Sequence, residues 1–161
     1  MKIAIIFGTK HGSAQECALH LAEKITCKVS VYNLSKKEVP LIDDVDMVIM
    51  GSSVYAGRLN KEVLTFANNH QEKLLQKKLM LFTCNMHRGE EEEKQLRNIF
   101  PEELTRHAQE LVSFGGKFDF SKLNFLEKVV IKKVAKVTTD IEDLRFDAIE
   151  ALAERINAEC V

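Results

Sequence analysis

The beginning of the chain most constrains its fold, because a short apolar run passes through a small polar loop into a helical pattern. Residues 3–7 are apolar and uninterrupted, which is typical of a strand buried on both faces of a parallel sheet. Apolar side chains then recur at helical spacing from Ala18 to Ile25. Residues 8–14 lie between the two patterns. The sequence therefore predicts a strand, a tight turn and a helix in succession.

The predicted turn suits a phosphate group. The first turn of a helix leaves backbone N–H groups unpaired, and the helix dipole favours an anion there. Thr9 and Ser13 can add hydroxyl donors, and Gly12 lets the backbone approach a phosphate closely. The alternative is an ordinary strand-to-helix turn that Ser13 caps. The turn alone does not separate these two interpretations.

Length and composition limit the class of protein. A chain of 161 residues is expected to form one domain, residues 1–161, with a substantial core. The net charge of -1 argues against nucleic-acid binding, which needs a basic surface. No apolar run is long enough to cross a bilayer, and the first residues predict a strand rather than an export signal. We therefore expect a cytoplasmic protein with reduced thiols at its four cysteines, Cys17, Cys27, Cys84 and Cys160.

The rest of the chain alternates strand and helix patterns. Further strands are predicted at residues 28–34, 47–51, 79–82 and 111–114. Helices are predicted at residues 63–67, from Glu90 onward, and from Asp140 to the end. Such alternation requires a parallel sheet covered on both faces, and right-handed crossovers leave few topologies. The predicted fold class is α/β, a doubly wound five-stranded parallel sheet with helices on both faces.

Three loops at strand ends point to a ligand, because ligands of doubly wound sheets bind at the carboxyl ends of the strands. They are residues 9–14, 52–57 and 83–87. The second loop carries Tyr55, one of only two tyrosines in a chain without Trp. Its ring can stack on a planar ligand, although it can also fold back as surface packing. Together, the first two loops predict a phosphorylated planar cofactor.

Over nearly its full length the chain resembles the flavodoxin family, in the order of its elements and in the 9–14 loop. Family members wrap the phosphate of FMN with a Thr-x-Thr-Gly-x-Thr pattern here, and this chain has His11 and Ala14 where hydroxyl residues are usual. The resemblance implies a flavodoxin-like fold with FMN as cofactor. The implied FMN-binding residues are Thr9, Lys10, His11, Gly12, Ser13, Ala14, Ser52, Ser53, Val54, Tyr55, Ala56, Gly57, Thr83, Cys84, Asn85 and Met86.

Within that superfamily the chain is most similar to the menaquinone-dependent protoporphyrinogen dehydrogenases, small FMN proteins of haem synthesis. The similarity lies in residues 51–57, 82–85 and 115–120, and in an added block at 123–137. It implies electron transfer, with a quinone or porphyrin-type small molecule as partner. The alternative is a non-catalytic carrier that docks with redox proteins. A receiver-like signalling domain is disfavoured, because no acidic pair follows the first strand.

The block at residues 117–137 has separate apolar and basic faces. Its six lysines are Lys117, Lys122, Lys128, Lys132, Lys133 and Lys136. One interpretation is a helix on a membrane surface that collects a lipid-soluble partner. We favour a helix docked on the sheet with its lysines in water, because such helices show the same pattern.

Single residues give weaker signals. Cys84 is either redox-active beside a flavin or a small apolar filler. His11 either assists a phosphate or lies in solvent. The other histidines show no metal-ligand spacing, and no nucleophile–base arrangement is evident, so any redox chemistry is expected to belong to the cofactor.

Overall fold

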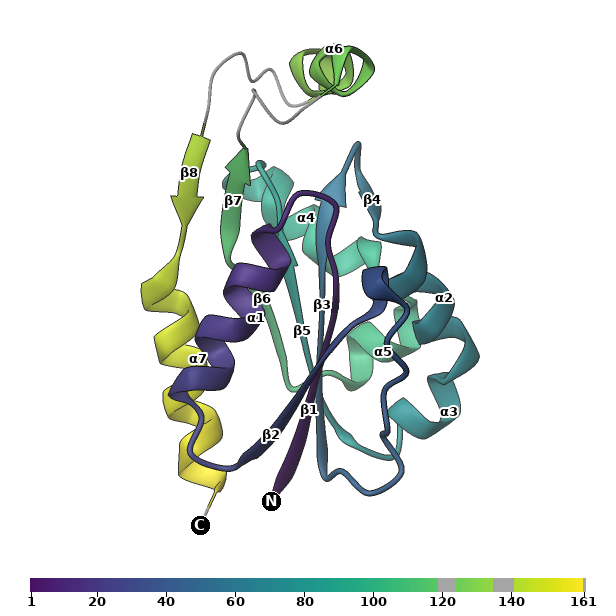
Figure 1. The fold of residues 1–161 in the computed structure, drawn as a ribbon, viewed down its shortest axis with the longest axis vertical. Helices are drawn as coiled ribbons and strands as arrows, with labels where there is room; N and C mark the ends of the chain where they lie inside the picture. Colours follow the sequence, from purple (N-terminus) through teal and green to yellow (C-terminus); the bar gives the residue numbers. More distant parts are fainter. Residues whose placement is uncertain (119–123, 135–140, 161) are drawn as a thin grey trace.

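The computed structural model describes residues 1–118, 124–134 and 141–160, and a parallel sheet forms its centre (Figure 1). The strand order is β2-β1-β3-β5-β6, and every pairing along this path is parallel. The strands are β1 (Lys2–Gly8), β2 (Lys28–Asn33), β3 (Met47–Tyr55), β5 (Lys78–Cys84) and β6 (Glu110–Ser113). The doubly wound α/β sheet expected from the sequence is confirmed.

Helices cover both faces of the sheet because its inner strands are apolar on both sides. Ile3 and Ile5 of β1 pack in one cluster with α1 (Ser13–Lys24) and α7 (Phe146–Glu159). Ala4 and Ile6 point the other way, toward helices α2, α3 and α5. These helices are α2 (Lys61–Asn69), α3 (Gln71–Leu74) and α5 (Glu102–His107); the chain also forms η1 (Leu34–Lys36) and α4 (Glu90–Ile99). Figure 1 shows α1 and α7 on the opposite side of the sheet from α2 and α3.

Strand β3 continues beyond the apolar run, so the expected loop at residues 52–57 is mostly strand. The ladder with β5 includes the pairs Ser52↔Thr83 and Ser53↔Cys84. The chain then turns at residues 56–57, which have φ angles of 50° and 74°, into the short antiparallel strand β4 (Arg58–Leu59). The apolar pattern predicted the end of this strand too early, because small polar residues replace apolar ones there while the backbone pairing continues.

A two-stranded antiparallel sheet replaces the expected start of the last helix. It consists of β7 (Gly115–Phe118) and β8 (Ile141–Leu144), with α6 (Phe125–Val134) between them in the sequence. Gly115 allows this pairing, because its φ is +76° and a Cβ there would lie 2.0 Å from the Asp143 carbonyl oxygen. The prediction of a helix from Asp140 is therefore wrong, and α7 begins at Phe146. Helical spacing in a sequence cannot reveal a distant strand partner.

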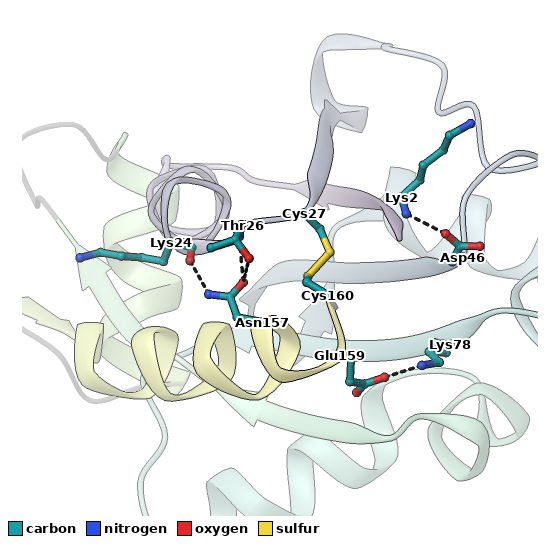
Figure 2. The surroundings of a disulfide bond; sticks show 9 residues. All are labelled: Lys2, Lys24, Thr26, Cys27, Asp46, Lys78, Asn157, Glu159 and Cys160. Atoms are coloured by element: carbon teal, nitrogen blue, oxygen red, sulfur yellow. Dashed lines mark hydrogen bonds and ion pairs between the residues drawn. A yellow bond between two sulfur atoms is a disulfide. The ribbon is translucent and has the colours of Figure 1, made fainter.

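A disulfide joins Cys27, just before β2, to Cys160 at the end of α7 (Figure 2). Asn157 supports this junction, since its side chain accepts a hydrogen bond from the Thr26 N–H at 2.8 Å and donates one to the Lys24 carbonyl at 2.8 Å. The expectation that all four cysteines are reduced is wrong for this pair. The two residues are 133 positions apart, and cysteine spacing alone cannot predict such a pairing.

Helix α6 stands beyond the carboxyl ends of the strands rather than on a face of the sheet (Figure 1). Its apolar side chains Phe125, Leu126 and Val129 are 79%, 73% and 45% exposed. The favoured expectation of a helix docked on the sheet is therefore wrong. Parts of the 117–137 block, residues 119–123 and 135–137, lie outside the described residues. No helix within the described residues is both long and apolar enough to span a membrane.

Candidate cofactor site

The 9–14 loop has a fixed shape because side chains from three segments bind its backbone. The Gly12 N–H donates to Thr9 Oγ1 at 2.9 Å, within the loop itself. The Thr9 N–H donates to Ser35 Oγ at 2.9 Å, and the Lys10 N–H donates to Ser53 Oγ at 3.2 Å. Thr9 thus shapes the loop through its hydroxyl. Ser53 joins this loop to β3, as the shared site predicted from the sequence requires.

The start of α1 is open to an anion. Gly12 is the N-cap with a φ of 96°, and no side chain in the described part of the chain caps the helix. Ser13 is therefore not the cap, since its hydroxyl donates to the Lys117 carbonyl of β7 at 3.1 Å. A Cβ at Gly12 would meet no atom of the described residues within 4 Å. The first-turn N–H groups of α1, which have no intrahelical partners, remain available to an anionic ligand.

Tyr55 lies over this loop. The Lys10 ammonium is 3.8 Å from the centroid of the Tyr55 ring, a cation–π contact. The His11 ring meets the same tyrosine edge-on, with ring centroids 6.4 Å apart. Burial, and then the nearby Glu127 carboxylate, raise the pKa of Tyr55. The structure thus brings together the first and second loops predicted from the sequence.

The end of β5 brings in two buried side chains. The Cys84 Sγ lies 3.6 Å from the Sγ of Cys17, and this contact and burial raise the pKa of Cys84 well above its usual value. A protonated, buried thiol is a poor nucleophile, which agrees with the apolar-filler interpretation. Asn85 is 2% exposed, and its Oδ1 has no hydrogen-bond partner within the described part of the chain. Such an orphaned acceptor suits an N–H group of a ligand.

Two charged residues near the site were not among those predicted from the sequence. Glu127 of α6 places Oε2 2.6 Å from Nε2 of His11. Lys117 of β7 contacts Glu16 at 3.3 Å, and this hydrogen bond, together with the Glu142 carboxylate, raises the pKa of Lys117. In the sequence, the only signal for Glu127 was its negative charge, because it is an acidic residue within a lysine-rich block. For Lys117, the signal was its position directly after two glycines at a strand end.

The three loops enclose a cavity of about 20 Å³, room for little more than one water molecule. It is lined by Lys10, His11, Ser13, Ser53, Val54, Tyr55, Cys84, Gly116 and Lys117. Nine of the sixteen residues predicted from the sequence are not among them: Thr9, Gly12, Ala14, Ser52, Ala56, Gly57, Thr83, Asn85 and Met86. A planar ring therefore enters only if the loops separate.

The residues present fit FMN, the cofactor that the sequence resemblance implies. The uncapped first turn of α1 and the open space at Gly12 suit a phosphate. The Tyr55 ring suits a planar ring system, and the unpartnered Asn85 oxygen suits one of its N–H groups. Within residues 1–118, 124–134 and 141–160, no group of three or more acidic, histidine or cysteine side chains could hold a metal ion.

Comparisons with known proteins agree with this fold. The chain is 21% identical over 157 residues to protoporphyrinogen IX dehydrogenase [quinone] of Escherichia coli strain K12, covering 92% of this chain and 87% of the relative. Among solved structures, oxidised flavodoxin 1 from Bacillus cereus aligns over 100% of both chains, with a TM-score of 0.60 and 15% identity. A WrbA-like flavodoxin from Agrobacterium tumefaciens aligns over 99% of this chain and 96% of its own, with a TM-score of 0.62 and 12% identity.

A family model described as a flavodoxin domain matches residues 4–145, which include all three loops of the site. This match covers most of the chain and agrees with the strand order of the sheet. The chain therefore belongs to the flavodoxin-domain family.

Proposed function

We propose that this flavodoxin-domain chain transfers electrons through one bound FMN, taking them from a hydrophobic two-electron donor and passing them to a quinone. One observation carries the proposal. The first turn of α1, whose N–H groups can bind an anion, and the Tyr55 ring line the same cavity at the carboxyl ends of the strands. Ligands of doubly wound sheets bind at this edge. The family match and the relative that shares 21% identity support the same cofactor and reaction class.

Each part of the site has a physical task in this proposal. The first-turn N–H groups of α1 bind the phosphate, while Thr9 keeps the turn in shape. Tyr55 covers one face of the ring, and the Asn85 oxygen accepts a hydrogen bond from the ring edge. FMN supplies the redox chemistry when bound, and the protein supplies its position and electrostatic environment. Cys84 stays a thiol that packs against Cys17.

The position and side chains of helix α6 favour a lipid-soluble redox partner. It contacts the 9–14 loop through Glu127, so it lies at the site, and it turns Phe125 and Leu126 outward. Lys132 and Lys133 on the same helix are exposed. An apolar face beside lysines favours a peripheral contact with an anionic membrane, where quinones dissolve. The protein would then act on the membrane surface.

Two measurements test the proposal. Purified protein should be yellow and release FMN on denaturation, and a colourless protein that fails to quench added FMN fluorescence would contradict FMN binding. Gly12→Val should abolish FMN binding with the sheet still folded. Gly89→Val is the matched control, because Gly89 also has a positive φ, +63°, and a Cβ there would likewise meet none of the described atoms within 4 Å.

The donor and acceptor are tested under anaerobic conditions. Protoporphyrinogen should reduce the bound FMN, and a menaquinone analogue should reoxidise it. If no small donor or quinone exchanges electrons with the flavin while a flavoprotein reductase does so readily, the protein is an electron carrier that docks with redox proteins.

A further inference from the structure

A second, larger recess of about 690 Å³ lies beside the cofactor cavity. Arg58 and Lys61 line it from β4 and the start of α2. Lys10, Ser53 and Tyr55 line both the recess and the cofactor cavity. The Lys10–Tyr55 cation–π pair therefore lies between the two spaces, and a molecule in the recess would lie beside the same tyrosine that lines the cofactor cavity.

The recess is rich in uncompensated positive charge. Lys10, Arg58 and Lys61 contribute three cationic side chains, and Glu62 contributes the only carboxylate among the lining residues that the structure describes. None of the three cations forms an ion pair with any carboxylate in the described ranges 1–118, 124–134 and 141–160. Lys117, which lines the smaller cavity, differs in that it contacts two carboxylates, Glu16 and Glu142. Unpaired cations around a concave surface favour an anionic ligand.

The floor of the recess is held by hydrogen bonds. Ser35 Oγ accepts from the Thr9 N–H at 2.9 Å and from Asn60 Nδ2 at 3.3 Å. The Asn60 N–H donates to Ser52 Oγ at 2.8 Å, and its Oδ1 caps α2 by accepting from the Glu62 N–H at 3.1 Å. This links η1, β3 and α2 into one base. The recess is therefore preorganised, which lowers the entropy cost of binding.

We propose that this recess binds an anionic group, a carboxylate or a phosphate, of an aromatic ligand whose ring lies against Tyr55. Arg58 and Lys61 contact the anionic group, and Tyr55 contacts the ring. Identification of this ligand as the electron donor rests on the proposed function, whereas the binding itself does not. The recess is separate from the place assigned to the FMN phosphate, because His11 and Ser13 line only the smaller cavity.

The test uses three small probes that share one ring: naphthoate, naphthyl phosphate and the uncharged naphthamide. Binding to the FMN-loaded protein is followed by changes in backbone amide NMR signals. Naphthoate or naphthyl phosphate should shift the amides of Tyr55, Arg58 and Lys61, and naphthamide should bind about tenfold more weakly. The tighter of the two anions identifies carboxylate or phosphate as the favoured group.

Charge variants separate a site from general attraction. Arg58→Gln with Lys61→Gln should weaken binding of the anionic probe about tenfold. The control, Lys28→Gln with Lys94→Gln, changes the net charge equally at exposed positions outside the recess and should leave the affinity unchanged. Tyr55→Leu should weaken naphthyl phosphate more than inorganic phosphate.

Three results would overturn the proposal. They are equal effects of the two double variants, signal changes centred on His11 and Ser13, and displacement of the probe by FMN. The same titration with FMN-free protein keeps the two hypotheses distinct. If the probe binds but FMN does not, the proposed function is contradicted and anion binding in the recess is supported. If FMN binds but the probe does not, anion binding in the recess is contradicted and the proposed function stands.

Discussion

Glu127 of the inserted helix α6 lies against His11 of the 9–14 loop, with Oε2 and Nε2 2.6 Å apart. This contact places a carboxylate beside a loop that otherwise favours anions. The same carboxylate acts on Tyr55, whose pKa it raises in addition to burial. One acidic side chain of α6 thus influences both loops of the cofactor site.

The Glu127 carboxylate should weaken binding of a doubly charged phosphate. Glu127→Gln keeps the shape of the side chain and removes its charge, so the affinity for FMN should rise about fivefold. Quenching of FMN fluorescence measures the dissociation constant. Glu150→Gln is the matched control, because Glu150 pairs with His20 at 3.4 Å outside the 9–14 loop. Weaker FMN binding in Glu127→Gln would show instead that the carboxylate acts mainly by orienting His11.

The ionisation of Tyr55 gives a pH test. Because burial and then the Glu127 charge disfavour the phenolate, the pKa of Tyr55 should lie above the ordinary value of 10.0. Glu127→Gln removes that negative charge and makes the phenolate easier to form. The titration midpoint of Tyr55 should therefore fall toward the ordinary tyrosine value without reaching it, because the effect of burial remains. A titration of phenolate absorbance in a Tyr32→Phe background isolates Tyr55. An unchanged midpoint would mean that Glu127 does not face the ring in solution.

The Cys27–Cys160 bond should contribute strongly to stability because it closes a loop of 133 residues. Its reduction should lower the free energy of unfolding by about 2–4 kcal/mol. Urea unfolding with and without a reductant measures this difference. The control is the double variant Cys27→Ser with Cys160→Ser, in which the reductant should have no further effect. A reductant effect that persists there would have to come from Cys17 and Cys84, and not from the disulfide.

The sequence predicted the parts of this fold that depend on local pattern. Uninterrupted apolar runs such as residues 3–7 identified the buried parallel strands, because a strand covered on both faces has no polar side. The same reasoning placed the 9–14 loop and Tyr55 at one edge of the sheet, where the structure brings them together. These predictions needed only the chain's own periodicity and the rule for crossover connections.

Features that depend on distant partners were not predictable. The pairing of β7 with β8, the Cys27–Cys160 bond and the His11–Glu127 contact each join segments far apart in the sequence. The helical spacing of α6 was correct, but spacing does not say whether the apolar side meets the sheet or points away from it. Ser13 shows the same limit at a single residue, since its hydroxyl binds the Lys117 carbonyl instead of capping α1.

The exposed apolar side of α6 should carry any contact with a membrane. Phe125→Ser with Leu126→Ser should reduce cosedimentation with anionic lipid vesicles, because these side chains are 79% and 73% exposed on a lysine-bearing helix. Val39→Ser with Leu41→Ser is the matched control, since these residues are 77% and 74% exposed elsewhere on the surface.

Charge reversal on the same helix separates the electrostatic part of this contact. Replacing Lys128, Lys132 and Lys133 with Glu should reduce binding to anionic vesicles, since each lysine near such a surface contributes about 1 kcal/mol. Binding to neutral vesicles should change little, because only the apolar side chains act there. If Phe125→Ser with Leu126→Ser loses no more vesicle binding than the control Val39→Ser with Leu41→Ser, α6 has no special affinity for lipid. The partner would then have to reach the flavin from solution.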